Sequence, residues 1–365
     1  MVSFQRGKYN HLRATCVRAT LLRPSTIVMT SEATSQGAAL LIERSDRLLM
    51  QFTGPKAAES LTGLVTNDVL GLRGGDGQYA CALTVKGRII ADVRILALLG
   101  ESGAVESLLV DANAASGVGF AAMIRKYVNP RTVKYTDLSM AMSCLTLVGE
   151  GAQAVLRAVA DVPERIDPVA HGDRFTHREL LFGGIHARVV QLPDLGPTPA
   201  FDLQVTAEHA ASLSATLTRA GAVPAGIGEW HRRRVLAGWP EWGVDMDEGT
   251  LAQEANMDAL QAISYQKGCY TGQETVARVH FRGHVNKTLR RICFDDGALP
   301  ARGAALSNAA GAVVGEARGA ALDDAQRGVG IAMVRREVAD GAELRWLDVG
   351  GGERVARVEG AVLEG

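Results

Sequence analysis

The sequence lacks the features of several specialised protein classes. Its apolar runs, such as residues 95–99, are far shorter than the roughly 20 residues that a transmembrane helix needs, so we expect no membrane span. Aromatic residues make up only 5% of the 365 residues, whereas apolar residues reach 47% and charged residues 22%. This composition supports sizeable cores and excludes a coiled coil or a disordered chain. The length predicts two or three globular domains.

The chain has no excess of charge of either sign and little cysteine. Lys and Arg (39) nearly balance Asp and Glu (40), so no whole-chain field would hold nucleic acid or an anionic membrane, and we expect neither as a partner. The five cysteines form no C-x-x-C pair, which argues against a disulfide framework and a zinc ribbon and favours a reducing compartment. They are Cys16, Cys81, Cys144, Cys269 and Cys293.

Acidic residues are missing from the first 31 positions, which are basic and rich in Ser and Thr and lack the apolar core of a secretory signal. Two interpretations are open. The segment is a transit peptide to the mitochondrial matrix, or it is upstream sequence and the true start is Met29. The Ala, Gly and Arg bias of the chain favours a bacterial, cytoplasmic protein. In either case we expect residues 1–36 to lie outside the fold.

From residue 38 onward, strand-like and helix-like patterns alternate irregularly. This mixture predicts an α+β fold, because a doubly wound sheet would show regular βαβ alternation. A tight turn at Lys86-Gly87 between two β-rich runs predicts a hairpin. The expected elements are strand 47–53, helix 54–64, hairpin strands 78–85 and 88–99, strand 105–110, helix 112–126, strand 144–148, helix 153–160, strands 184–191 and 201–205, and helices 207–220 and 228–237.

After about residue 287 the pattern changes to short β-prone runs separated by glycine. Such a pattern is typical of a small all-β barrel or sandwich. The expected strands are 288–294, 312–317, 328–335 and 343–347.

Two weak motifs do not support a site. Residues 117–122 match G-x-G-x-x-A, but five residues separate the glycines from the strand and no acidic residue follows in register, so we interpret them as helix-packing glycines. His280 and His284 lie four residues apart around Gly283, but a metal site needs three or four suitably placed ligands. We expect no metal centre.

The segment Lys267-Gly268-Cys269-Tyr270 carries the densest chemistry. If it is extended, Lys267 and Cys269 project to the same side, and the ammonium would lower the thiol pKa and make Cys269 nucleophilic. The alternative is that Cys269 is a small buried hydrophobe and Lys267 a solvated charge.

Residues 267–274, KGCYTGQE, resemble over their whole length the K-G-C-Y-x-G-Q-E signature of the YgfZ-type folate-binding proteins, relatives of the glycine cleavage aminomethyltransferase (T-protein). The resemblance runs from about residue 38 to 364. It also includes, in the family's order, residues 52–54 (FTG), 66–69 (TNDV), 77–79 (GQY), 86–88 (KGR) and 253–255 (QEA).

The resemblance implies a three-domain ring of the aminomethyltransferase type. Two interleaved α+β domains would occupy residues 37–286, a β-barrel residues 287–365, and a pocket for tetrahydrofolate or a polyglutamylated folate would lie at the centre. Lys267, Cys269 and Tyr270 match the family's signature. Glu254 aligns with an acid that helps to hold folate, and a carboxylate suits the amide-like edge of a pterin. Glu254 is alternatively an exposed loop acid.

One departure from the T-protein pattern concerns the paired aspartates that follow the hairpin turn. Here the pair reads Ala91-Asp92. This puts aminomethyl transfer in doubt, although Asp92 can still face the pocket.

Basic residues recur at period two in Arg278, His280, Arg282 and His284. An extended segment would place them on one strand face. They would then receive a folate polyglutamate tail, RNA phosphates or a partner's acidic surface, or form a solvated face. We assign Arg282 to the folate-binding set.

The sequence thus predicts a tetrahydrofolate-binding accessory protein that supports assembly or repair of iron-sulfur enzymes and contacts client or assembly proteins. Cys269 and Lys267 would supply a reactive thiol and its activating cation, and Asp92, Glu254, Tyr270 and Arg282 would bind folate. The rivals are a folate-dependent one-carbon transferase and an adaptor with a vestigial pocket.

Overall fold

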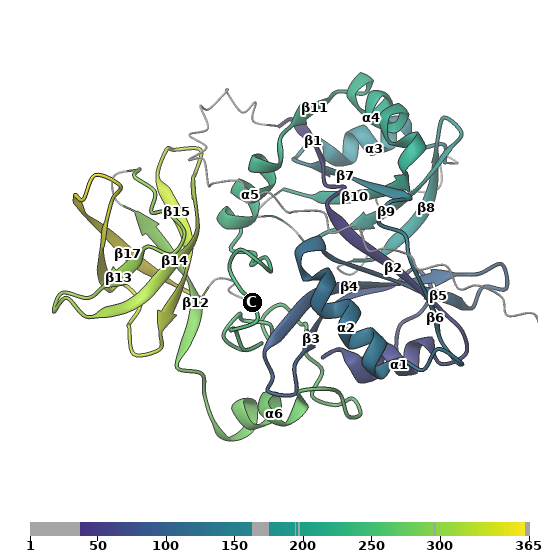
Figure 1. Cartoon of the computed structure of the whole chain (residues 1–365). Helices are drawn as coiled ribbons and strands as arrows, with labels where there is room; N and C mark the ends of the chain where they lie inside the picture. Colours follow the sequence, from purple (N-terminus) through teal and green to yellow (C-terminus); the bar gives the residue numbers. More distant parts are fainter. Residues whose placement is uncertain (1–36, 163–174, 194, 196–197, 295–296, 362–365) are drawn as a thin grey trace, which may run out of the picture. The chain divides into compact units, whose positions relative to one another are not determined.

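The computed structural model describes residues 37–162, 175–193, 195, 198–294 and 297–361. Two open sheets and one closed barrel account for all the strands named below (Figure 1). The expectations for residues 1–36 lie outside the described part of the chain. No helix within the described part is long and apolar enough to cross a membrane.

The first sheet has the strand order β3-β4-β5-β2-β6 and is antiparallel throughout. Gly87 has a φ of +74°, which suits the turn between β3 and β4. Helices α1 and α2 pack on one face of this sheet around Phe52, Leu61 and Phe120. The bounds are β2 Arg47–Thr53, α1 Ala57–Leu64, β3 Gly77–Leu83, β4 Ile89–Leu99, β5 Val105–Asn113, α2 Gly117–Tyr127 and β6 Lys134–Asp137.

The second sheet has the order β11-β1-β7-β10-β9-β8, in which only the β1–β11 pair is parallel. Helices α3 and α4 cover it around Leu156, Leu213 and Leu217. The chain enters this sheet at β1, leaves for the first sheet and returns at β7. The bounds are β1 Ala39–Glu43, β7 Met142–Val148, α3 Ala152–Val159, β8 His177–Phe182, β9 Ile185–Gln191, β10 Ala200–Thr206, α4 Ala210–Arg219 and β11 Ala222–Ala225.

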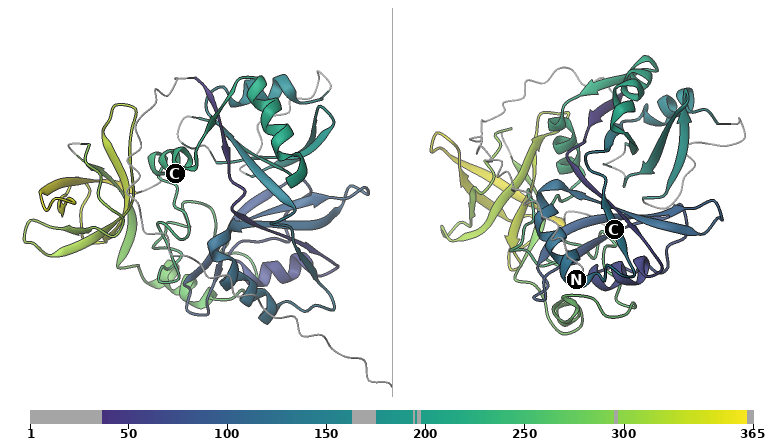
Figure 2. Two further views of the ribbon diagram at one scale, coloured as in Figure 1. Left: turned by 45° about the horizontal axis from the view of Figure 1, so that its top comes forward. Right: turned by 45° about the vertical axis from the view of Figure 1, so that its right-hand side comes forward.

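The carboxy-terminal strands close into a barrel in the order β12-β15-β14-β13-β16-β17, seen in yellow and light green in Figure 2. Inward residues such as Ile292, Leu344 and Trp346 fill it. Before the barrel come α5 (Ile227–Leu236), which contacts β1, β14 and β15, and α6 (Gln273–Arg282). The barrel strands are β12 Lys287–Phe294, β13 Ala305–Ser307, β14 Val313–Leu322, β15 Gly328–Arg335, β16 Glu343–Leu347 and β17 Glu353–Ala361.

The sequence predicted the α+β class and the carboxy-terminal barrel correctly, and the expected hairpin is β3–β4. The helix expected at 112–126 begins later, because β5 continues to Asn113 and a 3-10 turn precedes α2. The extended segment expected at 278–284 is wrong, since α6 runs to Arg282. Strands β1, β6, β8, β11, β13 and β17 were not predicted.

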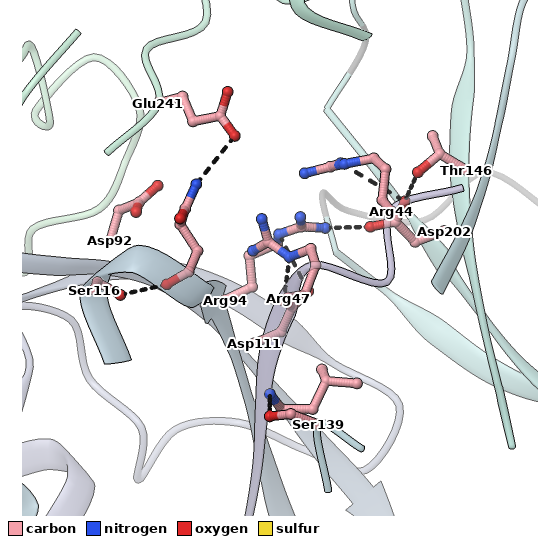
Figure 3. A network of polar contacts seen from close by, with 12 residues as sticks. Arg44, Arg47, Asp92, Arg94, Asp111, Ser116, Ser139, Thr146, Asp202 and Glu241 are labelled. Carbon is pink, nitrogen blue, oxygen red and sulfur yellow. Dashed lines mark hydrogen bonds and ion pairs between the residues drawn. The ribbon is translucent and has the colours of Figure 1, made fainter. Parts of the chain in front are cut away.

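A buried cluster of charges joins the two sheets (Figure 3). Arg94 on β4 donates from Nη1 to Asp202 Oδ2 on β10 at 2.6 Å, and its Nε lies 3.5 Å from Asp111 Oδ2 on β5. Arg47 on β2 pairs with Asp111, and Arg44, just after β1, lies 4.0 Å from Asp202. All five side chains are at most 9% exposed.

The pKa values in this cluster show how strongly the charges depend on one another. Burial alone would raise the pKa of Asp202, but Arg94 and Arg44 hold it at about 2. Burial alone would lower the pKa of Arg94, but Asp111 and Asp202 raise it. For Arg44, burial prevails over the attraction of Asp202 and lowers the pKa to about 10. Arg44 also stacks 3.5 Å over the Trp230 ring on α5.

We predict that Asp202→Asn lowers the free energy of unfolding by about 3–5 kcal/mol, because it leaves two buried arginines without their shared counter-charge. Urea unfolding at neutral pH measures this. The difference should vanish as pH falls from 3.8 towards 2, where Asp202 itself is protonated.

Asp324→Asn is the matched control. Asp324 pairs with Arg232 but its side chain is 70% exposed, so the cost should stay below about 1 kcal/mol. Equal stability of the two variants would contradict a structural role for the buried cluster.

Candidate functional site

A carboxylate and a phenol meet on the face of the β3–β4 hairpin that is turned away from α1 and α2. Tyr79 Oη donates to Asp92 Oδ2 at 2.7 Å. In the register of the hairpin Cys81 lies opposite Asp92 and Tyr79 opposite Arg94, so Tyr79 and Asp92 are diagonal neighbours on one face. The other carboxylate oxygen, Asp92 Oδ1, is buried and has no hydrogen-bond partner within the described structure.

Two further aromatic rings lie near Tyr79. The Tyr79 ring centroid lies 5.6 Å from that of Trp239 and 6.0 Å from that of Phe175. Burial raises the pKa of Asp92, although the hydrogen bond from Tyr79 opposes the shift. Burial and the nearby Asp92 carboxylate raise the pKa of Tyr79. Asp92 is therefore a buried acceptor whose carboxyl group holds its proton more tightly than a solvated one does.

Glu241 brings a second carboxylate to this region from the segment after α5 (Figure 3). Its Oε2 lies 2.8 Å from Arg234 Nε and 3.2 Å from His231 Nδ1, and Asn113 donates to its Oε1 at 3.3 Å. Burial would raise the pKa of Glu241, but His231 and Arg234 lower it to about 2. Glu241 thus has two basic side chains within ion-pair distance of its Oε2, although that oxygen, like Asp92 Oδ1, makes no hydrogen bond within the described structure.

Ala91 faces the opposite side of β4 from Asp92. It is fully buried in the core under α1 and α2, with Ala80, Ala82 and Val93. The replacement of an aspartate by alanine at this position therefore removes no carboxylate from the Asp92 face. The change of the aspartate pair to Ala91-Asp92 therefore argues less strongly against one-carbon transfer than the sequence alone indicates.

Glu254 lies in the coil segment between α5 and α6 and is only 8% exposed. Its Oε2 accepts from Leu251 N at 2.9 Å, and its carbonyl accepts from Leu289 N at 2.8 Å. The exposed loop acid that was the alternative for Glu254 is therefore ruled out. Next to it, Gln253 donates to Val276 O at 2.9 Å while its Oε1 is buried without a partner in the described residues.

The Lys267 ammonium anchors the signature loop to the loop after α1. It donates to the carbonyl oxygens of Thr62, Val65 (2.6 Å) and Asn67 (3.2 Å) and lies 4.6 Å from the centroid of the Tyr270 ring. Burial lowers its pKa from 10.5 to about 8, and Asp68 opposes this shift. The lysine is not the solvated charge of the alternative interpretation.

Cys269 is exposed and Tyr270 is buried in the central core. Within the described structure no contact joins Lys267 Nζ to Cys269 Sγ, so the activating role of Lys267 stays a prediction. Burial raises the pKa of Tyr270. Gly272 has a φ of +86° and packs so closely on Thr84 O that a side chain would not fit, which explains the glycine at this point of the signature.

Arg282 ends α6 and is exposed. Because residues 273–282 are helical, the four basic residues do not share a strand face, and that expectation is wrong. Arg278 and Arg282 instead lie one helical turn apart. No described contact links Arg282 to Asp92 or to Glu254.

The structure thus brings Asp92 together with Tyr79, and Lys267 with Tyr270, but within its described residues no hydrogen bond joins these pairs to each other or to Glu254. The sequence reasoning missed Tyr79, Trp239, Glu241 and Gln253. Tyr79 could have been predicted from the sequence, because strand pairing about the Lys86-Gly87 turn places residues 79 and 92 on one face of the hairpin. Within the described residues no three His, Cys, Asp or Glu side chains form a metal-binding group.

We predict that wild-type protein gains stability relative to Lys267→Met as pH rises from 8 to 10.5. Below pH 8 the lysine is charged in both states and carries the full cost of burial. Above it the folded protein releases the proton before the unfolded chain does, so the free energy of unfolding rises.

Urea unfolding across this pH range measures the effect. Lys86→Met, in the exposed turn between β3 and β4, is the control and should keep the wild-type trend. Parallel trends for Lys267→Met and wild type would refute a buried, low-pKa lysine.

Comparison with known proteins identifies relatives of the chain. It is 30% identical over 269 residues to the mitochondrial iron-sulfur cluster assembly factor IBA57 homolog of Neurospora crassa, covering 71% of this chain but only 55% of that protein. It is 26% identical over 246 residues to the tRNA-modifying protein YgfZ of Hamiltonella defensa, covering 66% and 65%. The chain thus spans little more than half of the Neurospora protein's length.

The fold has a solved counterpart. The glycine cleavage system aminomethyltransferase T of Bartonella henselae superposes with a TM-score of 0.75 at 19% identity, over 89% of this chain and 86% of that one. At this identity the likeness shows the aminomethyltransferase fold. The GCVT N-terminal domain family matches residues 25–265, well over half of the sequence. The chain therefore belongs to the GCVT N-terminal domain family, with proteins named YgfZ and IBA57 homolog among its relatives.

Proposed function

We propose that this protein binds tetrahydrofolate and supports the assembly or repair of iron-sulfur enzymes. The observation that carries the proposal is the buried Asp92 Oδ1, which has no hydrogen-bond partner among the described residues and belongs to a carboxylate bonded to Tyr79, whose ring lies near those of Trp239 and Phe175. A buried acceptor without a donor calls for a ligand or water with an N–H or O–H group.

Tetrahydrofolate fits this setting. Its pterin presents several N–H donors and its p-aminobenzoyl ring suits an aromatic environment. Asp92 would accept from the pterin, and Tyr79 would hold the carboxylate in place through its hydrogen bond. When bound, tetrahydrofolate would carry one-carbon groups on its N5 or N10 nitrogen or bridging the two. The folate-binding roles of Glu254, Tyr270 and Arg282 are part of the proposal, and the exposed Arg282 suits only the tail of a polyglutamylated folate.

Cys269 is proposed as the reactive thiol. The Lys267 ammonium holds the loop to three backbone carbonyls, so the loop presents Cys269 to solvent from a fixed position. Exposure on an anchored loop is what a thiol needs to meet a macromolecular client. The name of the Neurospora relative supports an iron-sulfur client or assembly protein as that partner.

A one-carbon transferase is the second candidate function. The Asp92–Tyr79 pair favours it, since a carboxylate whose pKa is raised by burial is a better proton acceptor than a solvated one. The fold likeness to an aminomethyltransferase fits either function. A folate-dependent demethylation assay on a small methylated amine separates them, because only a transferase would turn over.

The compartment is likewise a proposal. The composition favours a bacterial cytoplasm, whereas the Neurospora relative is named as mitochondrial and would suit a transit peptide at residues 1–31. Tracking the full-length and Met29-started chains in cells distinguishes the two.

We predict that Asp92→Asn weakens tetrahydrofolate binding at least about tenfold. The amide keeps an acceptor for Tyr79 but loses the charge and offers an N–H to the pterin donors, and hydrogen bonds to charged groups contribute about 1.5–3 kcal/mol. Isothermal titration with tetrahydrofolate and a polyglutamylated folate measures the affinity.

Glu254→Gln in the same titration tests the second acid, and its binding role predicts a similar loss. Asp324→Asn, far along the sequence and exposed, is the control and should bind as wild type does. Unchanged affinity in Asp92→Asn would exclude the proposed folate site.

We also predict that Cys269→Ala folds normally but abolishes complementation of a strain that lacks the corresponding iron-sulfur maturation activity. The readout is the activity of an iron-sulfur enzyme in extracts. Cys293→Ala is a matched control, because Cys293 lies on barrel strand β12 and its thiol is held by Glu359. Full complementation by Cys269→Ala would remove the thiol from the mechanism.

A further inference from the structure

The outer side of α6 and its neighbourhood carry an unusual combination of exposed aromatic and basic side chains. We call this the α6 surface and define it by Tyr265, Arg278, His280, Phe281 and Arg282. Four of the five are exposed and Tyr265 is half-buried. The folate proposal leaves most of this surface unexplained.

The aromatic members form one ordered cluster. The rings of Tyr265 and His280 stack with centroids 3.7 Å apart, and the Phe281 ring lies edge-on to both at 6.0 Å and 4.7 Å. Tyr265 is fixed further by its hydrogen bond to Asp258. Phe281 is nevertheless 68% exposed, the highest value for any aromatic side chain in the described part of the chain. A rigidly held, solvent-facing phenyl ring is typical of an interface anchor.

The two arginines of the surface are available to pair with a partner's carboxylates. Arg278 and Arg282 lie one turn apart, and neither has an ion-pair partner among the described residues. Glu274 is the one acidic residue of α6. The β3–β4 turn adds to this region, because Gly87 packs against Thr275 and the same turn exposes Val85 and Lys86.

The α6 surface is also tied to the Cys269 loop. Tyr270 N donates to Gln273 Oε1 at 3.4 Å, and Gln273 N donates to Tyr270 O at 3.2 Å. The loop that exposes Cys269 therefore runs directly into the first turn of α6. A partner bound to the helix would be held beside the thiol.

We propose that the α6 surface docks an acidic segment of a partner protein, with an apolar side chain of that segment seated against Phe281. Charge complementarity assigns the partner's acidity to Arg278 and Arg282, and the exposed ring assigns its apolar residue. The surface itself is independent of the proposed function. Only the placing of the partner beside Cys269 rests on it.

A folate polyglutamate tail or RNA suits the surface less well. A polyglutamate tail could contact Arg282, as in the proposed function, but it has no apolar group for Phe281 and so does not account for the surface as a whole. RNA bases need open ring faces, and here the Tyr265 and His280 rings stack on each other. The chain's net charge of −1 adds no attraction for phosphates at a distance.

The test measures fluorescence anisotropy of labelled probes on the full chain. One probe is a short peptide with Asp and Glu around a central Leu-Phe, and a second replaces the acids by Asn and Gln. A third is a short oligouridylate. We expect the acidic peptide to bind about tenfold more tightly than the amide peptide at low ionic strength and to lose that advantage at high salt.

The Arg278→Gln/Arg282→Gln double variant should lose this preference, and Phe281→Ala should weaken both peptides. Tyr127→Ala, an exposed aromatic residue on α2, is the control and should change nothing. Equal binding of the two peptides, unchanged binding by the variants, or tighter binding of the oligouridylate would each overturn the proposal.

Titration of folate into the same variants keeps the two proposals apart. Phe281→Ala should bind tetrahydrofolate as wild type does. Absence of folate binding in the wild type would defeat the proposed function and leave the peptide result standing.

Discussion

The burial of Arg94 between Asp111 and Asp202 is the constraint on which the rest of this structure depends. A guanidinium removed from water is tolerated only when carboxylates pair with it, and here the two carboxylates come from different sheets. This fixes which face of β4 turns towards the second sheet. Because side chains alternate along a strand, the same face carries Asp92, and the opposite face carries Ala91 into the apolar core.

Removal of charged groups from water also determines the properties of the candidate site. Asp92 keeps one buried oxygen without a hydrogen-bond partner among the described residues, which costs folding free energy unless a ligand supplies a donor. Lys267, in contrast, is surrounded by carbonyl oxygens and serves to hold the loop that presents Cys269. The two candidate groups therefore differ in how the fold positions them. Asp92 is buried next to few donors, whereas Cys269 is exposed on a loop whose backbone Lys267 anchors.

Predictions from the sequence succeeded where a pattern was local. The Lys86-Gly87 turn and the alternating runs on either side indicated the hairpin, and glycine-separated β runs indicated the barrel. They failed where local patterns were ambiguous. The alternating basic residues after Thr275 looked like a strand face, but Val276 packs inwards as part of a helix. Short strands such as β11 form only because a distant strand pairs with them.

The sequence by itself determined the class of fold and the signature loop, and the resemblance of its motifs to a known family nominated Asp92, Glu254 and Cys269 as candidate residues, because patterns and motifs are local properties of the chain. Only the tertiary structure decided which of them have partners. The pairing of Tyr79 with Asp92, the carbonyl cage of Lys267 and the burial of Glu254 all require segments far apart in the sequence to meet. The burial and the hydrogen bonds of a side chain depend on residues that are distant in the sequence, so they cannot be read from the segment that contains it.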